Sequence, residues 1–356
     1  MRKLQSLFIG VIAIILLLTF SVVRLNHSSN ASSQVLNIYN WGDYIDPELL
    51  KQFEKEYGYK VNYETFDSNE AMEAKIKQGG TAYDIAIPSE YMIQKMKKEH
   101  LLSSLDHTKI HRLKNIDPRF LDLDFDKENR YSIPYFWGTL GIVYNDKFVD
   151  GDKIKHWEDL WRPELKNNIM LIDGAREVMG LSLTTFGHSI NSKDKKHLTQ
   201  ATKKLNALTP NVKAIVADEI KMYMANEESA VAVTFSGEAA DMMAENEHLH
   251  YVIPPEGSNL WFDNIVIPKT SKNQEGAYDF INFMLKPEIA KQNAEYIGYS
   301  TPNKTALAML PKNISGDKQF YPDDKTISHL EVYKNLGAKY LGIYNDLYLE
   351  LKMYRK

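Results

Sequence analysis

Apolar and polar positions follow two kinds of spacing along the first part of the chain. Residues 35–39, 61–65 and 85–87 form short apolar or alternating runs that predict strands. Between them, residues 47–57 and 68–78 place apolar side chains at helical spacing, and each of these two segments is followed by glycine. The order strand, helix, strand, helix, strand predicts a largely parallel sheet with helices packed on it.

A second region of alternating elements begins after residue 160. It contains predicted strands at residues 168–171, 212–216 and 230–235, separated by helical patterns. The aromatic stretch 131–138 leads into the strand 141–145, and the two are interpreted either as a crossover between lobes or as a core strand with bulky neighbours. Because 356 residues suggest about two domains, the whole pattern predicts an α/β protein of two units.

Aromatic and polar side chains follow the ends of several predicted strands. Trp41 and Tyr44 come after the first strand, and Ser89 and Tyr91 come after the third. Because the ligand of a parallel sheet binds outside the carboxyl ends of the strands, we expect these four side chains at one edge of the sheet.

Trp261 and Asp263 stand two residues apart just before the apolar run 265–267, so they share one side of an extended chain. An indole face attracts a cation, and a carboxylate accepts charge-assisted hydrogen bonds from an ammonium group. The simpler alternative is a core tryptophan beside a surface aspartate. The recurrence of similar clusters after other strands favours a site for a cation.

The N-terminal residues differ from the rest of the chain. Arg2 and Lys3 precede an apolar run over residues 7–23, which predicts an export signal outside the fold. Residues 29–31 match a cleavage site only in part, so an uncleaved membrane anchor is a second interpretation. The chain has no cysteine, which excludes disulfides, thiolate metal sites and lipid attachment through cysteine.

Charge and motifs narrow the range of functions. A net charge of −4 argues against a protein that binds nucleic acid. No P-loop, G-x-S-x-G or G-x-G-x-x-G pattern occurs, and His248 and His250 have no evident third partner for a metal ion. We therefore expect a binding protein without a cofactor, a metal ion or catalytic residues.

The chain from residue 36 to residue 337 resembles the spermidine/putrescine-binding proteins of bacterial ABC transporters. Six motifs in the family's order carry the resemblance: Asn40-Trp41-x-x-Tyr44, Tyr83-Asp84-x-x-x-Pro88-Ser89, Tyr131-Ser132-Ile133-Pro134-Tyr135, Ala175-Arg176-Glu177-Val178, Gly257-x-x-x-Trp261-x-Asp263 and Ile297-Gly298-Tyr299-x-Thr301-Pro302-Asn303. The resemblance implies a periplasmic-binding-protein-like α/β fold of type II. Two lobes, each a mostly parallel sheet flanked by helices, would hold the ligand in the cleft between them.

The resemblance also implies how the chain is divided between the lobes. Residues 34–139 and 261–308 would form lobe 1, and residues 140–260 and 309–356 would form lobe 2. Residues 1–33 would be the signal peptide or membrane anchor with its linker.

Matched position by position, the resemblance implies an aromatic box around the methylene chain of a polyamine and polar partners for its amino groups. The box residues are Trp41, Tyr44, Tyr91, Trp261 and Tyr299. The polar residues are Ser89, Glu177 and Asp263. The distance between two separated carboxylates would then select polyamines of a matching length.

Several positions depart from the family pattern, so the resemblance does not imply which polyamine is preferred. Gly174 replaces a second aspartate, Phe235 a tryptophan, Ala217 a serine and Tyr333 a glutamine. The further candidates for contact with the ligand are Asp43, Asp173, Phe235 and Tyr333. Without a carboxylate at position 174, we expect a narrower preference for spermidine over putrescine.

The function implied by the resemblance is that of an extracytoplasmic, monomeric receptor that closes around a polyamine. It would deliver this ligand to the permease and ATPase subunits of an ABC importer and would associate with the membrane through its N-terminal segment. Three alternatives are a receptor of the same fold for another small cation or peptide, a receptor that only signals, and an extracellular enzyme. The enzyme would use Trp41 and Trp261 as platforms for sugar rings and would need two suitably spaced catalytic carboxylates.

Overall fold

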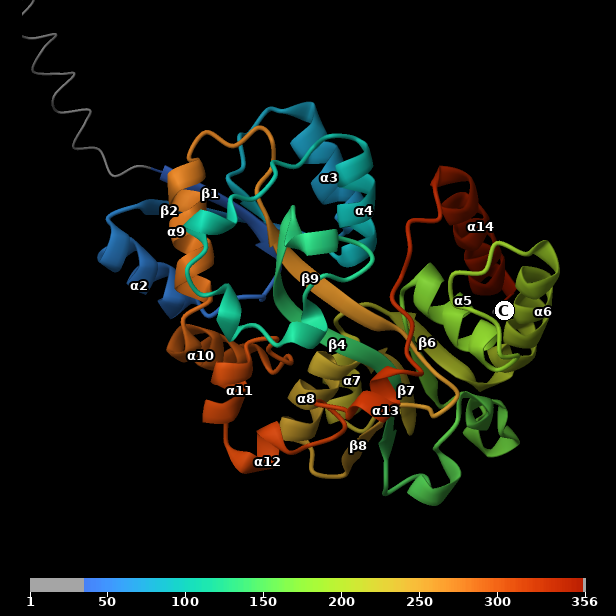
Figure 1. The fold of residues 1–356 in the computed structure, drawn as a ribbon. Helices are drawn as coiled ribbons and strands as arrows, with labels where there is room; N and C mark the ends of the chain where they lie inside the picture. The colour runs from blue at the N-terminus through green and yellow to red at the C-terminus, as the bar shows by residue number, and fades with distance from the viewer. Residues whose placement is uncertain (1–34, 355–356) are drawn as a thin grey trace, which may run out of the picture.

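Nine strands form one sheet of hydrogen-bonded neighbours in the computed structural model, which describes residues 35–354. They are β1 (Val35–Trp41), β2 (Lys60–Phe66), β3 (Ile85–Ala86), β4 (Ser132–Asn145), β5 (Ile169–Ile172), β6 (Val212–Val216), β7 (Val231–Phe235), β8 (Leu249–Val252) and β9 (Leu260–Val266). The order is β2-β1-β3-β9-β4-β7-β5-β6, with β8 paired to β4 (Figure 1). Pairing is parallel between β1 and its neighbours β2 and β3, and between β5 and its neighbours β6 and β7, as the alternation predicted.

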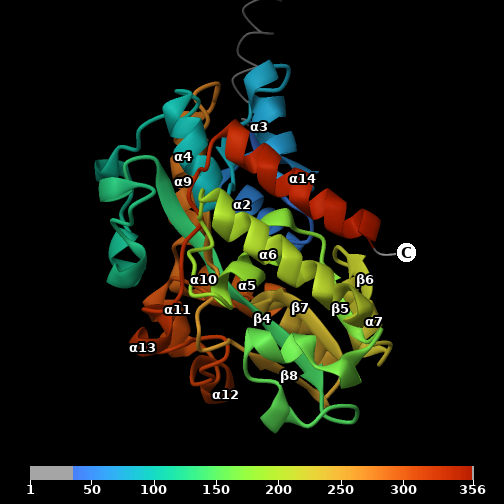
Figure 2. The same cartoon turned by 90° about the vertical axis from the view of Figure 1, so that its right-hand side faces the viewer.

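The helices cover the two ends of this sheet (Figures 1 and 2). Around β1, β2 and β3 lie α2 (Pro47–Tyr57), α3 (Asn69–Gln78), α4 (Glu90–Lys98), α9 (Gln274–Met284) and α10 (Pro287–Ile297). Around β5, β6 and β7 lie α5 (Ala175–Thr184), α6 (Lys195–Leu208), α7 (Ile220–Ala225), α8 (Ser236–Glu245) and α14 (Ala338–Tyr354). Short helices α11 (Lys304–Met309), α12 (Lys312–Ser315) and α13 (Asp324–Ile327) connect the two groups.

Capping residues explain where the first helices begin and end. The Asp46 carboxylate accepts a hydrogen bond from the backbone N–H of Glu48 at the start of α2, and Gly58 ends this helix with a φ of 78°. The Ser68 hydroxyl accepts from the backbone N–H of Ala71 at the start of α3. These are the ends predicted from the sequence.

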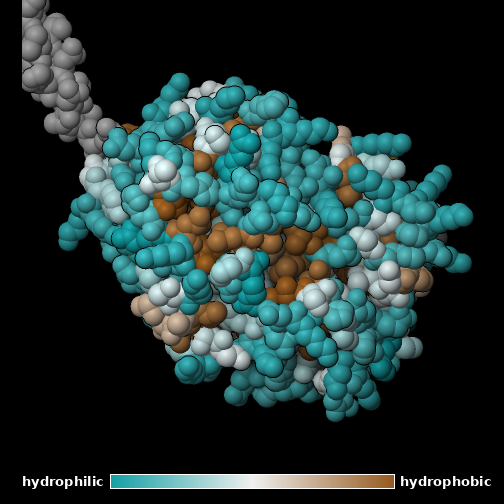
Figure 3. Space-filling model, viewed as in Figure 1, coloured by the Kyte–Doolittle hydropathy of each residue, from teal (hydrophilic) through white to brown (hydrophobic). Residues whose placement is uncertain are grey.

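Strand β4 belongs to two separate cores. Its first half pairs with β9, and its second half pairs with β7 and β8. Ile133 and Phe136 pack in one core, whereas Leu140 and Ile142 pack in the other. We call the parts of the chain around these cores lobe 1 and lobe 2. The aromatic stretch is therefore part of a crossover between lobes, and apolar side chains gather in the middle of the face where the lobes join (Figure 3).

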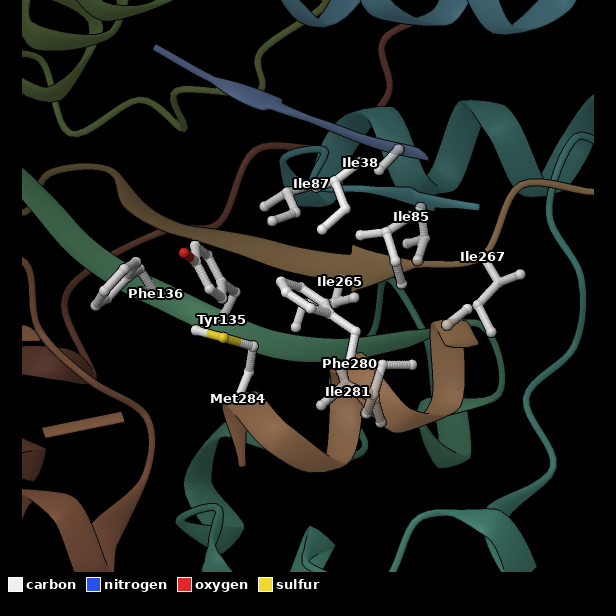
Figure 4. Packing of buried hydrophobic residues seen from close by; sticks show 14 of the residues in the cluster. Ile38, Ile85, Ile87, Tyr135, Phe136, Ile265, Ile267, Phe280, Ile281 and Met284 are labelled. Carbon is white, nitrogen blue, oxygen red and sulfur yellow. The ribbon is translucent and has the colours of Figure 1, made fainter. Parts of the chain in front are cut away.

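The core of lobe 1 is built from segments far apart in the sequence (Figure 4). Ile38 and Ile85 come from the parallel strands, Ile265 comes from β9, and Phe280 and Met284 come from α9. Burial of these side chains joins β9 to the N-terminal half of the lobe. The residues that precede Ile265 on β9 are thereby held at the junction of the lobes.

The structure does not test two of the predictions, the N-terminal signal or anchor and the division of the chain between the lobes. The predicted signal or anchor lies in residues 1–33, outside the described residues. Within residues 35–354, no helix is both long and apolar enough to cross a bilayer. The predicted division between lobes stays a prediction. The connecting region packs against both cores, since Phe320 contacts lobe 2 and Tyr321 contacts lobe 1.

Candidate binding site

Three segments of lobe 1 meet at the buried side chain of Asp263 on β9. Its Oδ2 accepts a hydrogen bond from the Tyr44 hydroxyl at 2.7 Å, and its Oδ1 accepts one from Ser89 Oγ at 2.6 Å. Tyr44 follows β1, and Ser89 precedes α4, so both come from the carboxyl ends of neighbouring parallel strands. The structure brings together residues that the sequence analysis placed at this edge.

The carboxyl group of Asp263 has no charged partner in this arrangement, because both hydrogen-bond donors are neutral hydroxyls. Burial raises the pKa of Asp263 to about 6, while the hydrogen bonds from Ser89 and Tyr44 act in the opposite direction. A buried carboxylate of this kind is stabilised by a ligand that brings a positive charge.

Aromatic rings surround this carboxylate. The Trp261 and Tyr299 rings have centroids 5.4 Å apart, and the Tyr44 and Tyr299 rings have centroids 5.3 Å apart. Phe235, at the end of β7 in lobe 2, lies edge to face with Trp261 at 6.1 Å. The Trp261 indole Nε1 is buried without a hydrogen-bond partner in the described structure. A site lined by several aromatic ring faces suits both the methylene chain and the positive charge of a ligand.

Two glycines make room for these rings, and the sequence analysis did not identify either of them as part of the site. A Cβ atom at Gly237, in the first turn of α8, would collide with the Tyr299 ring. A Cβ atom at Gly138, in β4, would lie 2.5 Å from the Trp261 ring. The rings of lobe 1 therefore lie directly on the backbone of the crossing strand and of lobe 2.

The two other predicted box residues lie at the outer edge of the cluster. Trp41 is half-buried and packs on Phe66, with ring centroids 4.5 Å apart. The Tyr91 hydroxyl accepts a hydrogen bond from Asn69 Nδ2 at 3.1 Å. Its hydroxyl also donates to Glu70 Oε1 at 3.3 Å. Burial raises the pKa of Tyr91, and the negative charges of Glu70 and Glu177 raise it further.

Glu177 stands in the first turn of α5, where the helix dipole favours a negative charge. Burial raises the pKa of its carboxyl group. The carboxylate lies over Gly174, since a Cβ atom at that position would collide with Glu177 Oε2. Gly174 thus leaves space that the Glu177 side chain fills.

The predicted acidic candidates Asp173 and Asp43 have other surroundings. Asp173 accepts hydrogen bonds from the Tyr348 hydroxyl at 2.7 Å and from Lys352 Nζ at 2.8 Å, both on α14. Asp43 is exposed in the turn after β1 and has a backbone φ of 47°. The structure brings neither carboxylate to the group around Asp263 and Glu177.

Tyr333 belongs to the segment between α13 and α14, which runs between α4 and α5 (Figure 1). Its backbone oxygen accepts a hydrogen bond from Gln94 Nε2 of α4 at 3.2 Å, and the Arg176 guanidinium of α5 lies 4.2 Å from its ring centroid. Its hydroxyl is buried without a hydrogen-bond partner in the described structure. Tyr333 therefore connects the two lobes beside Glu177.

Two lobes joined by crossing strands, with aromatic rings and the buried carboxylate of Asp263 at their junction, define a solute receptor of the two-lobed class. The sequence profile described as "Bacterial extracellular solute-binding protein" matches residues 48–322, and the chain belongs to this family.

Named relatives and solved structures agree with this assignment. The "Spermidine/putrescine-binding periplasmic protein" of Salmonella typhimurium is 41% identical over 328 residues, which cover 92% of this chain and 93% of the relative. The structure of the spermidine/putrescine ABC transporter substrate-binding protein PotD from Streptococcus pneumoniae is 64% identical, with a TM-score of 0.84, covering 91% of this chain and 100% of that one. The structure titled "Putative spermidine/putrescine ABC transporter" from Listeria monocytogenes is 63% identical, with a TM-score of 0.86 and the same coverage.

Proposed function

We propose that this chain is the extracytoplasmic receptor of a polyamine ABC importer. It captures spermidine or putrescine between its lobes by hinge closure and delivers the ligand to the permease and ATPase subunits. We propose further that the protein is a monomer and that residues 7–23 attach it to the membrane.

The observation that carries the proposal is the surroundings of Asp263. A buried carboxylate without a charged partner lies against the rings of Tyr44, Trp261 and Tyr299. A second carboxylate, that of the half-buried Glu177, comes from the first turn of α5 in lobe 2. A flexible chain of methylene groups with an ammonium group at each end matches apolar walls that end in carboxylates.

Titration calorimetry with spermidine, putrescine and n-butylamine tests the proposal. Both polyamines are expected to bind at least about tenfold more tightly than n-butylamine, because a second charge-assisted hydrogen bond contributes about 1.5–3 kcal/mol. Preferential binding of a lysine-containing peptide would identify a receptor for a different cation. Hydrolysis of a sugar oligomer would replace the proposal by an enzymatic one.

Ligand binding is expected to depend on pH through Asp263. Its pKa of about 6 in the unliganded protein means that protonation competes with the amine below this pH. Polyamine affinity should therefore fall by up to about tenfold per pH unit from pH 6 to pH 5. The raised pKa of Glu177 acts in the same direction. An affinity that stays constant from pH 7 to pH 5 would contradict this role of the two carboxylates.

Position 174 provides a test of ligand preference. Gly174→Asp adds a carboxylate at the Glu177 end and displaces the Glu177 side chain that now fills this space. The ratio of spermidine affinity to putrescine affinity should rise, because a further carboxylate at this end attracts the higher charge of spermidine more strongly than that of putrescine. Gly174→Ala displaces Glu177 without adding a charge, so it serves as the control. An unchanged ratio in Gly174→Asp would mean that position 174 does not face the ligand.

A further inference from the structure

Glu90 is a buried carboxyl group that the site described above does not use. It is the first residue of α4 and is 0% exposed. Its Oε2 accepts a hydrogen bond from the backbone N–H of Phe262 at 2.9 Å. Its Oε1 is buried and has no hydrogen-bond partner in the described structure. A half-satisfied carboxyl group in the interior is costly, so its unpartnered oxygen requires an explanation.

The position of Glu90 places it among the predicted ligand contacts. It stands between Ser89 and Tyr91 in the sequence, and Phe262, which donates to it, stands between Trp261 and Asp263. Along the same edge of β9, Ser89 pairs with Asp263. The carboxyl group of Glu90 thus lies next to the aromatic box.

The segment between α13 and α14, which carries Tyr333, also forms a hydrogen bond along this edge of β9. The backbone N–H of Leu260 donates to the Glu331 carbonyl oxygen at 2.9 Å, two residues before Tyr333. Burial is the main cause of the raised pKa of Tyr333, and the charges of Glu177 and Glu90 raise it further. Its hydroxyl is buried without a hydrogen-bond partner in the described structure.

No positively charged side chain of the described residues forms an ion pair with the Glu90 carboxylate. Burial raises its pKa to about 8, the Phe262 N–H opposes this shift, Asp263 raises the pKa further and Arg176 lowers it. Arg176 makes no hydrogen bond to Glu90 in the described structure: its two terminal nitrogens donate to Asn191 Oδ1 at 2.8 Å and to the Lys334 carbonyl oxygen at 3.3 Å, and its Nε is buried without a partner. A cation at Oε1 would supply the partner that the described structure lacks.

We propose that Glu90 is a third carboxylate of the binding site and that its unpartnered Oε1 holds a protonated amino group of the bound polyamine. This inference rests on the proposed function. Asp263, Glu90 and Glu177 then match the three amino groups of spermidine, whereas putrescine needs only two of them. The third charge of spermidine has a partner although position 174 is glycine.

Glu90→Gln separates this role from a structural one. The amide oxygen can still accept from the Phe262 N–H, but the amide cannot ionise and so supplies no negative charge to a bound amine. We expect spermidine affinity to fall by about tenfold or more, and putrescine affinity by less than about threefold. Glu54→Gln is the matched control, because Glu54 Oε1 also accepts one backbone N–H, from Val61 at 2.7 Å, on α2 of the same lobe. It should leave both affinities unchanged.

Proton release provides a second measurement. Spermidine binding to the full chain is measured by calorimetry at pH 7.5 in buffers of different ionisation enthalpy. Wild type should release a proton as Glu90 ionises, and Glu90→Gln should lose this part of the release. This measurement on wild type tests the inference even if the variant is unstable, since no proton release would overturn it.

The possible outcomes separate the inference from the proposed function. If wild type binds neither amine, the proposed function fails. If wild type binds both and Glu90→Gln behaves like Glu54→Gln, only the role of Glu90 fails. An equal loss for both amines in Glu90→Gln would assign Glu90 to lobe closure and would also overturn the inference.

Discussion

Asp263→Asn is expected to weaken polyamine binding by about thirtyfold or more, since removing the charge that pairs with a buried cation typically costs about 2–5 kcal/mol. The amide keeps an oxygen that can accept from one of the two hydroxyl donors, Tyr44 and Ser89. The loss therefore measures the contribution of the negative charge. Calorimetry with spermidine and putrescine provides the measurement.

The same substitution should not destabilise the unliganded protein at neutral pH. Raising the pKa of Asp263 from 3.8 to about 6 costs the folded state on the order of 3 kcal/mol when the group is ionised. This cost is absent below the unfolded pKa, grows as the pH rises through the folded pKa, and is constant above it. The amide introduced by Asp263→Asn does not titrate, so urea unfolding of the variant should lack this loss of stability between pH 4 and pH 6.

Asp106→Asn is the control for this prediction. Asp106 is exposed and caps a short turn by accepting a hydrogen bond from the backbone N–H of Thr108 at 3.0 Å. The change removes the same charge from a residue outside the aromatic box and should leave polyamine affinity unchanged. Equal effects of the two substitutions would disprove the assignment of Asp263 to the ligand.

Trp261→Ala should reduce polyamine affinity by on the order of a hundredfold, because the ligand loses an apolar wall and a face that attracts cations. Trp261→Phe should have a smaller effect, since phenylalanine keeps a weaker π face. The substitution to phenylalanine removes no hydrogen bond within the described structure, because Trp261 Nε1 has no partner there. Binding is measured by calorimetry and stability by thermal unfolding.

Trp157→Phe is the matched control in the core of lobe 2. Trp157 is fully buried, and its Nε1 donates to the Gly257 carbonyl oxygen at 2.8 Å. Trp157→Phe should therefore lower the unfolding temperature more than Trp261→Phe does, and it should change polyamine affinity less. The opposite order in both measurements would show that Trp261 is a structural residue.

Much of the fold could be predicted because the residues at helix ends and the order of strands and helices determine local structure directly. Asp46 and Gly58 fix the ends of α2 through a capping hydrogen bond and a left-handed backbone. The order of strands and helices then places the residues after β1 and β3 at one edge, where Tyr44 and Ser89 contact Asp263.

Other parts of the site depend on contacts between segments far apart in the sequence. Gly237 resembles any glycine in a strand-to-helix turn until the Tyr299 ring is seen to lie on it. Glu90 resembles an ordinary acidic residue in the first turn of a helix until Phe262 is seen to donate to it. Sequence spacing also could not show that Asp173 contacts α14, because that helix follows more than 160 residues later.

The exchange of segments between lobes has a consequence for the order of folding. A chain that emerges from the ribosome from its N-terminus makes β1, β2 and β3 long before β9 and α9, which complete the lobe 1 core. The lobe 2 core likewise includes Tyr344 and Leu351 of the last helix. Neither lobe can reach its final packing until most of the polypeptide has been synthesised. Such long-range contacts slow folding, so a nascent chain remains incompletely folded until late in its synthesis.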